Sequence, residues 1–203
     1  MVKRQSALLL ALALLAICCA AAAESEERPL VRDELNLYDD DEIGQMEAII
    51  RRIQSLYQVD VTVLTTYKVD EGPTSLTVAY ADKYSDDNGY GLGSDRAGVV
   101  FLVDMTNRFN YISTAGVMID YLTDGRIESI LDAADPYLYS GNYGQAMLAE
   151  LRQTESFLAQ GLVEGSFRYD AETGERLNGI YNPLTRNEIL LAISAGAIVV
   201  QQI

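Results

Sequence analysis

Apolar residues recur every three or four positions in three segments of the chain, which is typical of amphipathic helices. These segments cover residues 40–57, 75–85 and 142–160. Asp39 and Glu42 stand at the start of the first segment with the spacing of a capping box, in which each side chain bonds to the backbone of the other. The pattern therefore predicts three helices, the first with a well-defined beginning.

A further helical segment follows Thr123 and Asp124, either of which can cap its N-terminus. Proline lacks a backbone N–H and clashes with the preceding turn of a helix. We therefore expect this helix to stop at Pro136.

Three other segments have the patterns of strands. Residues 59–63 alternate valine with polar residues, whereas residues 99–103 are an unbroken apolar run, which is typical of a strand buried on both faces. Residues 109–114 form the next strand, and the connection before it is so short that an antiparallel hairpin is predicted. Arg108, beside the turn at Asp104, is expected to form a salt bridge within that hairpin, and an anion clamp is the alternative.

In chain order the elements are α-β-α-β-β-α-α, which predicts an α/β fold with a small mixed β-sheet sandwiched by helices. This domain covers residues 24–162, and its first residues, 24–37, are interpreted as an extended lead-in. Residues 163–187 are rich in Gly, Asp, Glu and Asn and are expected to be a polar linker. Residues 188–203 are an apolar tail.

The tail leaves two alternatives open. Its apolar stretch, residues 189–200, would span about 18 Å as a helix, compared with about 30 Å for the hydrocarbon core of a bilayer. The stretch is either a truncated transmembrane helix or a short helix that packs on the domain.

The first 23 residues have the three parts of a secretory signal peptide. Lys3 and Arg4 are followed by an apolar stretch and by small residues that include Ala21 and Ala23. Cleavage after Ala23 is the prediction, and a lipoprotein site at one of the two neighbouring cysteines is the alternative. The domain is therefore expected to be secreted across the cytoplasmic membrane.

Charge and composition exclude several classes of function. The chain has 30 acidic and 15 basic residues, and loss of the signal peptide would leave a net charge of −17. Nucleic-acid binding is not expected, because phosphates require a basic surface. The chain contains no histidine and both cysteines lie in the signal peptide, so Ser-His-Asp and Cys-His catalysis and His/Cys zinc sites are excluded from the mature protein. The glycines at 89, 91 and 93 precede a strand, which is the wrong context for a nucleotide-binding loop.

Several motifs, in consistent order over residues 30–162, resemble the TPM domain family. The resemblance is carried by the lead-in at 31–35, the glycine-rich loop at 86–93, the strand at 98–103, residues 107–108, the strand and glycine exit at 111–116, the Thr-Asp at 123–124 and the polar loop at 138–143. The chain departs from the family in having Arg96-Ala97-Gly98 before the strand and Gly116-Val117-Met118 after the hairpin.

This resemblance implies a module that supports the assembly, repair or upkeep of membrane proteins. It also implies a C-terminal membrane anchor, as in bacterial relatives, which favours the truncated-anchor interpretation of the tail. Some members of the family are labelled acid phosphatases, so the resemblance also implies that activity as an alternative.

Parallel pairing of the two longest strands would bring several loops to one end of the sheet. Four aspartates would then converge there: Asp87, Asp95, Asp120 and Asp124. Ligand sets made only of oxygen suit a hard cation, so we expect Ca²⁺, with Mg²⁺ as the alternative. Capping of a helix by Asp124 and simple solvation of Asp87 and Asp95 are the competing explanations.

Three hypotheses follow. The leading one is a non-catalytic, membrane-anchored extracytoplasmic module that binds Ca²⁺, a membrane or envelope protein, or both. The second is a metal-assisted acid phosphatase, in which a divalent ion activates water. The third is a structural cell-envelope domain without a ligand.

Overall fold

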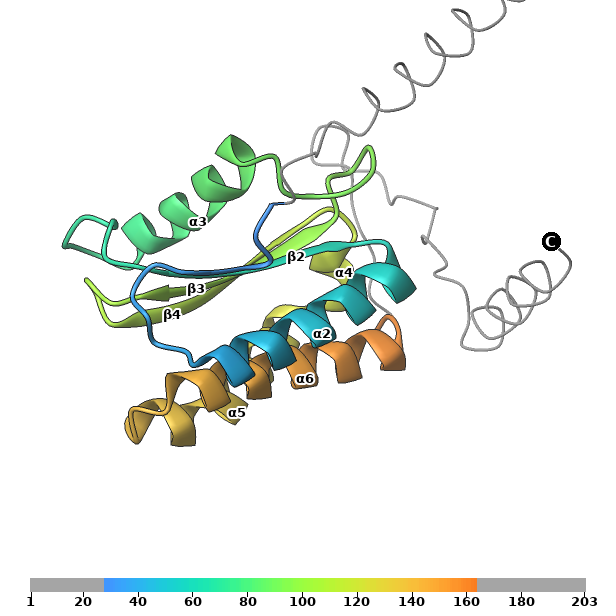
Figure 1. The fold of residues 1–203 in the computed structure, drawn as a ribbon. Coiled ribbons are helices and arrows are strands. Elements are labelled where there is room, and N and C mark those ends of the chain that lie inside the picture. Colours follow the sequence, from blue (N-terminus) through green and yellow to red (C-terminus); the bar gives the residue numbers. More distant parts are fainter. Residues whose placement is uncertain (1–27, 164–203) are drawn as a thin grey trace, which may run out of the picture.

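Residues 28–163 are described by a computed structural model, in which helices cover both faces of one four-stranded sheet (Figure 1). Across the sheet the strands are β1 (Val31–Asp33), β2 (Asp60–Thr66), β3 (Gly98–Asp104) and β4 (Phe109–Ala115). The first three strands are parallel, and β4 is antiparallel to β3. The predicted α/β fold, with a small mixed sheet between helices and two long parallel strands, is confirmed.

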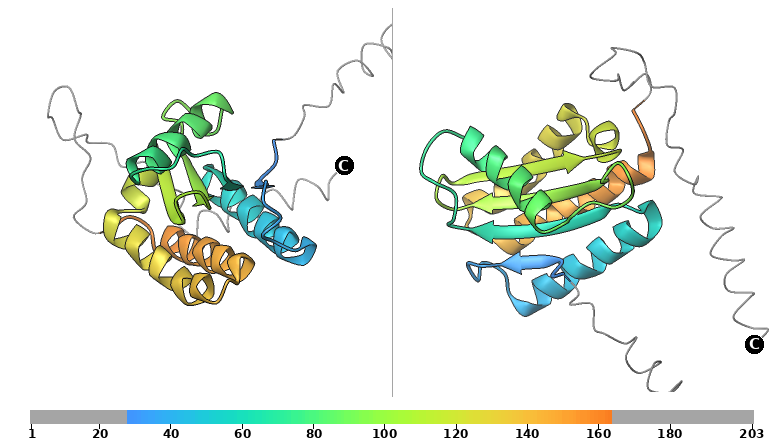
Figure 2. Two further views of the ribbon diagram at one scale, coloured as in Figure 1. Left: turned by 90° about the vertical axis from the view of Figure 1, so that its left-hand side faces the viewer. Right: turned by 90° about the horizontal axis from the view of Figure 1, so that it is seen from above.

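The helices form two unequal layers. They are α2 (Asp40–Tyr57), α3 (Ser75–Asp87), α4 (Met118–Tyr121), α5 (Asp124–Tyr139) and α6 (Tyr143–Gln160). Figures 1 and 2 show α2, α5 and α6 on one face of the sheet and α3 on the other. This arrangement leaves β1 and β4 as the two edges of the sheet.

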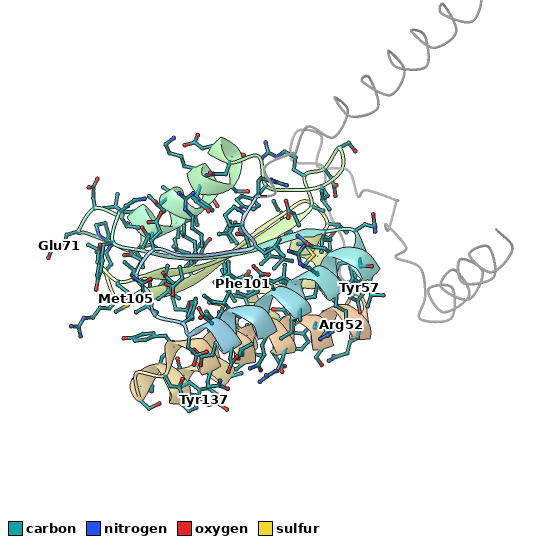
Figure 3. The ribbon with its side chains drawn as sticks, in the orientation of Figure 1. Arg52, Tyr57, Glu71, Phe101, Met105 and Tyr137 are labelled. Carbon is teal, nitrogen blue, oxygen red and sulfur yellow. The ribbon has the colours of Figure 1, made fainter. Side chains whose placement is uncertain are left out.

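Two hydrophobic cores lie on the two faces of the sheet. The larger core contains Ile50 of α2 and Phe101 of β3, both fully buried, and Figure 3 labels Phe101 between the sheet and α2. The smaller core, under α3, contains Leu64, Ala81 and Leu102. Each fully buried large side chain contributes about 1.5–3 kcal/mol to folding. Strand β3 supplies residues to both cores, which is why its sequence is an unbroken apolar run.

The N-terminus of α2 has the predicted capping box. The Asp39 carboxylate accepts a hydrogen bond from the Glu42 N–H at 2.8 Å, and the Glu42 carboxylate accepts one from the Asp39 N–H at 3.2 Å. These two bonds satisfy donors that have no partner inside the helix.

Three elements differ from the sequence prediction. Residues 31–33 form strand β1 rather than part of a lead-in. They pair with β2, beginning with Val31 opposite Val63. The single-turn helix α4 was not predicted. Helix α5 continues past Pro136 to Tyr139, and the Ser140 hydroxyl then donates to the Tyr137 carbonyl at 2.9 Å. Pro136 lies in the last turn of α5, so the helix continues for only three residues beyond it.

Membrane anchoring stays a prediction from the sequence. Within residues 28–163, no helix has both the length and the apolar character needed to cross a bilayer. The proposed signal peptide (1–23), residues 164–187 of the linker and the apolar tail (188–203) lie outside the described residues. These domain boundaries therefore stay predictions.

Candidate functional site

The glycine-rich loop is held against the sheet by Asp60, a residue that sequence reasoning took as an ordinary strand position. Asp60 is buried, and its carboxylate accepts hydrogen bonds from Arg28 Nη2, Gln54 Nε2 and Gly91 N, each at 3.0 Å. Three segments far apart in sequence therefore meet at one carboxylate. This role is structural, because the protein itself supplies the donors.

Asp95, one of the four predicted metal ligands, ties the same loop to the exit of the hairpin. Its Oδ2 accepts a hydrogen bond from the Val117 N–H at 3.0 Å. Gly116, the residue before Val117, has a positive φ of 61°. A Cβ at this position would lie 2.5 Å from the Asp95 carbonyl oxygen. Position 116 therefore requires glycine, because the backbone of residue 95 approaches too closely to leave room for a side chain.

The other three predicted ligands occupy separate elements. Asp87 forms an ion pair with Lys83 at the end of α3, Asp120 lies in α4, and Asp124 begins α5. Thr123 is the N-cap residue of α5, although its side chain makes no capping bond, and Asp124 complements the helix dipole from the first turn. Within residues 28–163, no group of three or more acidic side chains is placed to hold a metal ion.

Asp124 does take part in a different arrangement, a groove along the outer edge of β4. The groove has a volume of about 570 Å³ and lies between α3 and α5. It is lined by Asp82, Tyr111, Ile112, Ser113, Thr114, Asp124, Ile127, Glu128, Leu131 and Asp132. We call this the edge groove.

The edge groove is strongly acidic. Four of its lining residues are carboxylates, namely Asp82, Asp124, Glu128 and Asp132, and none is basic. Asp82 accepts a hydrogen bond from the Ser113 hydroxyl at 2.8 Å. In the part of the chain that the structure covers, no lysine or arginine forms an ion pair with any of these four. Carboxylates gathered in one concave surface create a negative potential that attracts cationic groups.

The groove also runs along an open edge of the sheet. β4 is an edge strand, and four consecutive β4 residues, 111–114, line the groove. An edge strand presents backbone N–H and C=O groups that a further strand can pair with. Burial, reinforced by the Asp82 carboxylate, raises the pKa of Tyr111, so this phenol stays protonated at neutral pH. The groove therefore combines open backbone groups, one phenol and several negative charges.

Sequence reasoning found Asp124 but missed the other acidic residues of the groove. A signal for two of them was present, because Asp124, Glu128 and Asp132 are spaced by four residues and so lie on one face of a helix. Asp82 comes from another element, α3, and only the fold brings it to β4.

The comparisons with known proteins agree with this fold. A family model described as TPM domain matches residues 31–156. No curated protein matches this chain. A solved N-terminal domain of a protein from P. gingivalis is 23% identical with a TM-score of 0.59, and the match covers 68% of this chain and 87% of that one.

Two further solved structures are similar in fold. The N-terminal domain of the cg2496 protein from Corynebacterium glutamicum is 16% identical with a TM-score of 0.51, over 70% of this chain and 88% of that one. The BA42 protein from Bizionia argentinensis is also 16% identical, with a TM-score of 0.50, over 61% of this chain and 83% of that one. At these identities the structures support the fold alone. The family model spans most of the chain, and on that basis the protein belongs to the TPM domain family.

Proposed function

We propose that this protein is an extracytoplasmic, membrane-anchored binding module whose edge groove receives an extended, basic segment of a membrane or envelope protein. Binding would support the assembly or upkeep of that protein. The observation that carries the proposal is the set of four carboxylates, without a basic residue, along the open edge of β4.

Strand addition explains how such a segment would be held. Backbone hydrogen bonds to an open sheet edge supply affinity without reading sequence, and alternate side chains then point to the two sides of the edge. Lysine or arginine side chains of an added strand would reach the carboxylates of α5 on one side and Asp82 of α3 on the other. Opposite charges would also speed the encounter, more strongly at low salt.

The extracytoplasmic location rests on sequence features alone. It is supported by the signal-peptide pattern of residues 1–23, and the anchor is supported by the apolar tail at 188–203. Fractionation of cells that express the tagged chain tests both features. Recovery of uncleaved protein in the cytoplasm would contradict this part of the proposal.

A peptide-binding assay tests the groove. A fluorescent peptide that alternates lysine and valine over about six residues, the usual length of a strand, is titrated with the purified chain. We expect binding that weakens as salt is raised, and no binding of the peptide in which glutamate replaces lysine. Equal affinity for the two peptides would refute the proposal.

Matched variants separate the groove from general surface charge. The triple variant Asp124→Asn, Glu128→Gln, Asp132→Asn removes three charges from the groove and should weaken binding at least about tenfold. The control variant Asp40→Asn, Asp70→Asn, Glu71→Gln removes three exposed charges that do not line the groove and should bind as the wild type does. Equal losses in both variants would show that net charge alone attracts the peptide.

Ca²⁺, with Mg²⁺ as the alternative, is a second proposed ligand of the module. Asp124 connects the two proposals, because it is both a predicted metal ligand and part of the edge groove. Since no three carboxylates of residues 28–163 are arranged around one point, a bound ion would need water or partner oxygens to complete its shell. Weak, millimolar binding is therefore expected.

A further inference from the structure

A second cavity lies at the other end of the β3–β4 hairpin. It has a volume of about 580 Å³, which falls in the range of small-molecule sites. Its walls include Val103 and Asp104 at the carboxyl end of β3, together with Leu131 and Leu138 of α5 and Tyr143 of α6. Met105, also in its lining, is labelled at this end of the sheet in Figure 3. Open α/β sheets bind ligands beyond the carboxyl ends of their parallel strands, and this cavity has that position. We call it the hairpin pocket.

Two opposite charges line the hairpin pocket without pairing. Arg108 comes from the hairpin and Asp135 from α5, and both are exposed. Within residues 28–163, neither forms an ion pair with the other or with a third residue. The predicted salt bridge of Arg108 within the hairpin is wrong, because Asp104 is buried and accepts hydrogen bonds from Thr77 and Asn107 instead.

The pocket also has a polar wall beside its apolar ones. Asn110 lines the pocket, and its Nδ2 donates a hydrogen bond to the carboxyl group of Glu150, which is fully buried. Asn110 Oδ1 and Glu150 Oε2 have no hydrogen-bond partner among the described residues. The Asn110 amide therefore gives this wall of the pocket a polar character beside its leucines and tyrosines.

These features select one class of ligand. A simple cation would be repelled by Arg108 and a simple anion by Asp135, whereas a molecule that carries both charges satisfies both side chains. The guanidinium of arginine is well suited to a carboxylate, and an ammonium group can pair with the Asp135 carboxylate. The leucines and tyrosines around the cavity suit an apolar or aromatic group.

We propose that the hairpin pocket binds a small zwitterion with an apolar side chain, that is, a free apolar or aromatic α-amino acid. The carboxylate of the ligand pairs with Arg108, its ammonium group pairs with Asp135, and its side chain lies among Leu131, Leu138 and Tyr143. This site is distinct from the edge groove, although Leu131 lines both.

Titration followed by backbone and side-chain NMR tests the proposal. The purified chain is titrated with L-phenylalanine and L-leucine, and then with phenethylamine and 3-phenylpropionate, each of which keeps the phenyl group and lacks one charge. We expect saturable shifts at Phe109, Asn110 and Tyr143 with the amino acids. We expect each one-charge analogue to bind at least about tenfold more weakly, a loss of about 1.4 kcal/mol. Equal binding of the analogues, or no shift at the pocket with any amino acid, would overturn the proposal.

Charge variants localise the site. Arg108 has a positive φ of 50°, so Arg108→Asn is chosen because asparagine adopts this backbone region readily. Arg108→Asn and Asp135→Asn should each weaken amino-acid binding at least about fivefold, by the ion-pair argument above. Asp40→Asn, an exposed change on α2 that lines neither the hairpin pocket nor the edge groove, should leave it unchanged. Binding that survives both pocket variants would place the ligand elsewhere and refute the assignment. All three side chains are exposed, so thermal melts are expected to show intact folding.

Discussion

The side chain of Asn110 donates a hydrogen bond to the carboxyl group of Glu150, and the contact joins β4 to α6 in the interior of the domain. Glu150 is fully buried, and its other oxygen has no partner among the described residues. Burial raises the pKa of Glu150 to about 8, with Asp135 adding to the rise and the bond from Asn110 opposing it. At neutral pH this carboxyl group is therefore mostly protonated in the folded protein.

A pH-dependent stability follows from this burial. The folded pKa of about 8 lies above the ordinary glutamate pKa of 4.5, so the contribution of Glu150 to stability is fully present below about pH 4.5 and is lost as the pH rises from there through about 8. Glu150→Gln removes this titration while keeping the shape of the side chain. The variant should be more stable than the wild type between pH 6 and 9, and the difference should grow up to about pH 8 and then level off.

Thermal melts across this pH range measure the difference between the two proteins. Glu128→Gln, an exposed change on α5, controls for the general loss of a negative charge and should keep the slope of the wild type. A Glu150→Gln variant with the same slope as the wild type would show that Glu150 is already ionised in the folded protein.

Removal of the Asp60 carboxylate should loosen the glycine-rich loop. Asp60→Ala leaves the donors of Arg28, Gln54 and Gly91 without their acceptor, so we expect a loss of about 2–4 kcal/mol in the free energy of unfolding. Urea denaturation measures this loss, with the exposed Asp70→Ala as the control. A loss no larger than that of Asp70→Ala would mean that the three bonds contribute little.

Two glycine substitutions should have opposite signs. In Gly116→Ala the new Cβ would meet the Asp95 carbonyl oxygen at 2.5 Å in a left-handed backbone, so we expect a loss of more than about 2 kcal/mol. Gly44 lies inside α2, where a Cβ would meet nothing within 4 Å, so Gly44→Ala should stabilise by about 0.5–1 kcal/mol. Chemical denaturation of both variants checks the pair. A neutral Gly116→Ala would mean that the hairpin exit adapts without strain.

Calcium should stabilise the domain only modestly. If Ca²⁺ binds with a dissociation constant near 1 mM, a tenfold excess over that value adds roughly 1.4 kcal/mol. A rise of a few degrees in the melting temperature is expected, and Asp124→Asn should abolish it while Asp70→Asn should not. Calorimetry after treatment with a chelator, with Mg²⁺ in parallel, makes this measurement. A flat response to both ions would remove metal binding from the proposed function.

Local patterns predicted most of the fold. The spacing at Asp39 and Glu42 predicted the start of α2, and the unbroken run at 99–103 predicted a strand buried on both faces. Strand β1 has only three residues, so it carries too little periodicity to be recognised and depends on its pairing with β2. Pro136 misled the prediction of where α5 ends, because a proline disfavours the continuation of a helix without excluding it, and α5 runs on to Tyr139.

The candidate sites were harder to predict than the elements. The sequence pointed to aspartates near the glycine-rich loop, and the structure places them on separate elements, with Asp87 paired to Lys83 and Asp95 bonded to Val117. The acidic face of α5 was visible in its four-residue spacing. Its conversion into a groove required β4 and Asp82 of α3 to stand beside it.

The sequence by itself determined the alternation of helices and strands, the acidic character of the protein and the absence of imidazole chemistry, because each of these depends on residue identity and short-range spacing. Only the tertiary structure decided which carboxylates share a surface, which edge of the sheet stays open, and that Arg108 and Asp135 line one pocket without pairing. Such relationships join residues far apart in the chain. They arise from how the buried faces of the sheet and helices pack together, and no local pattern records that packing.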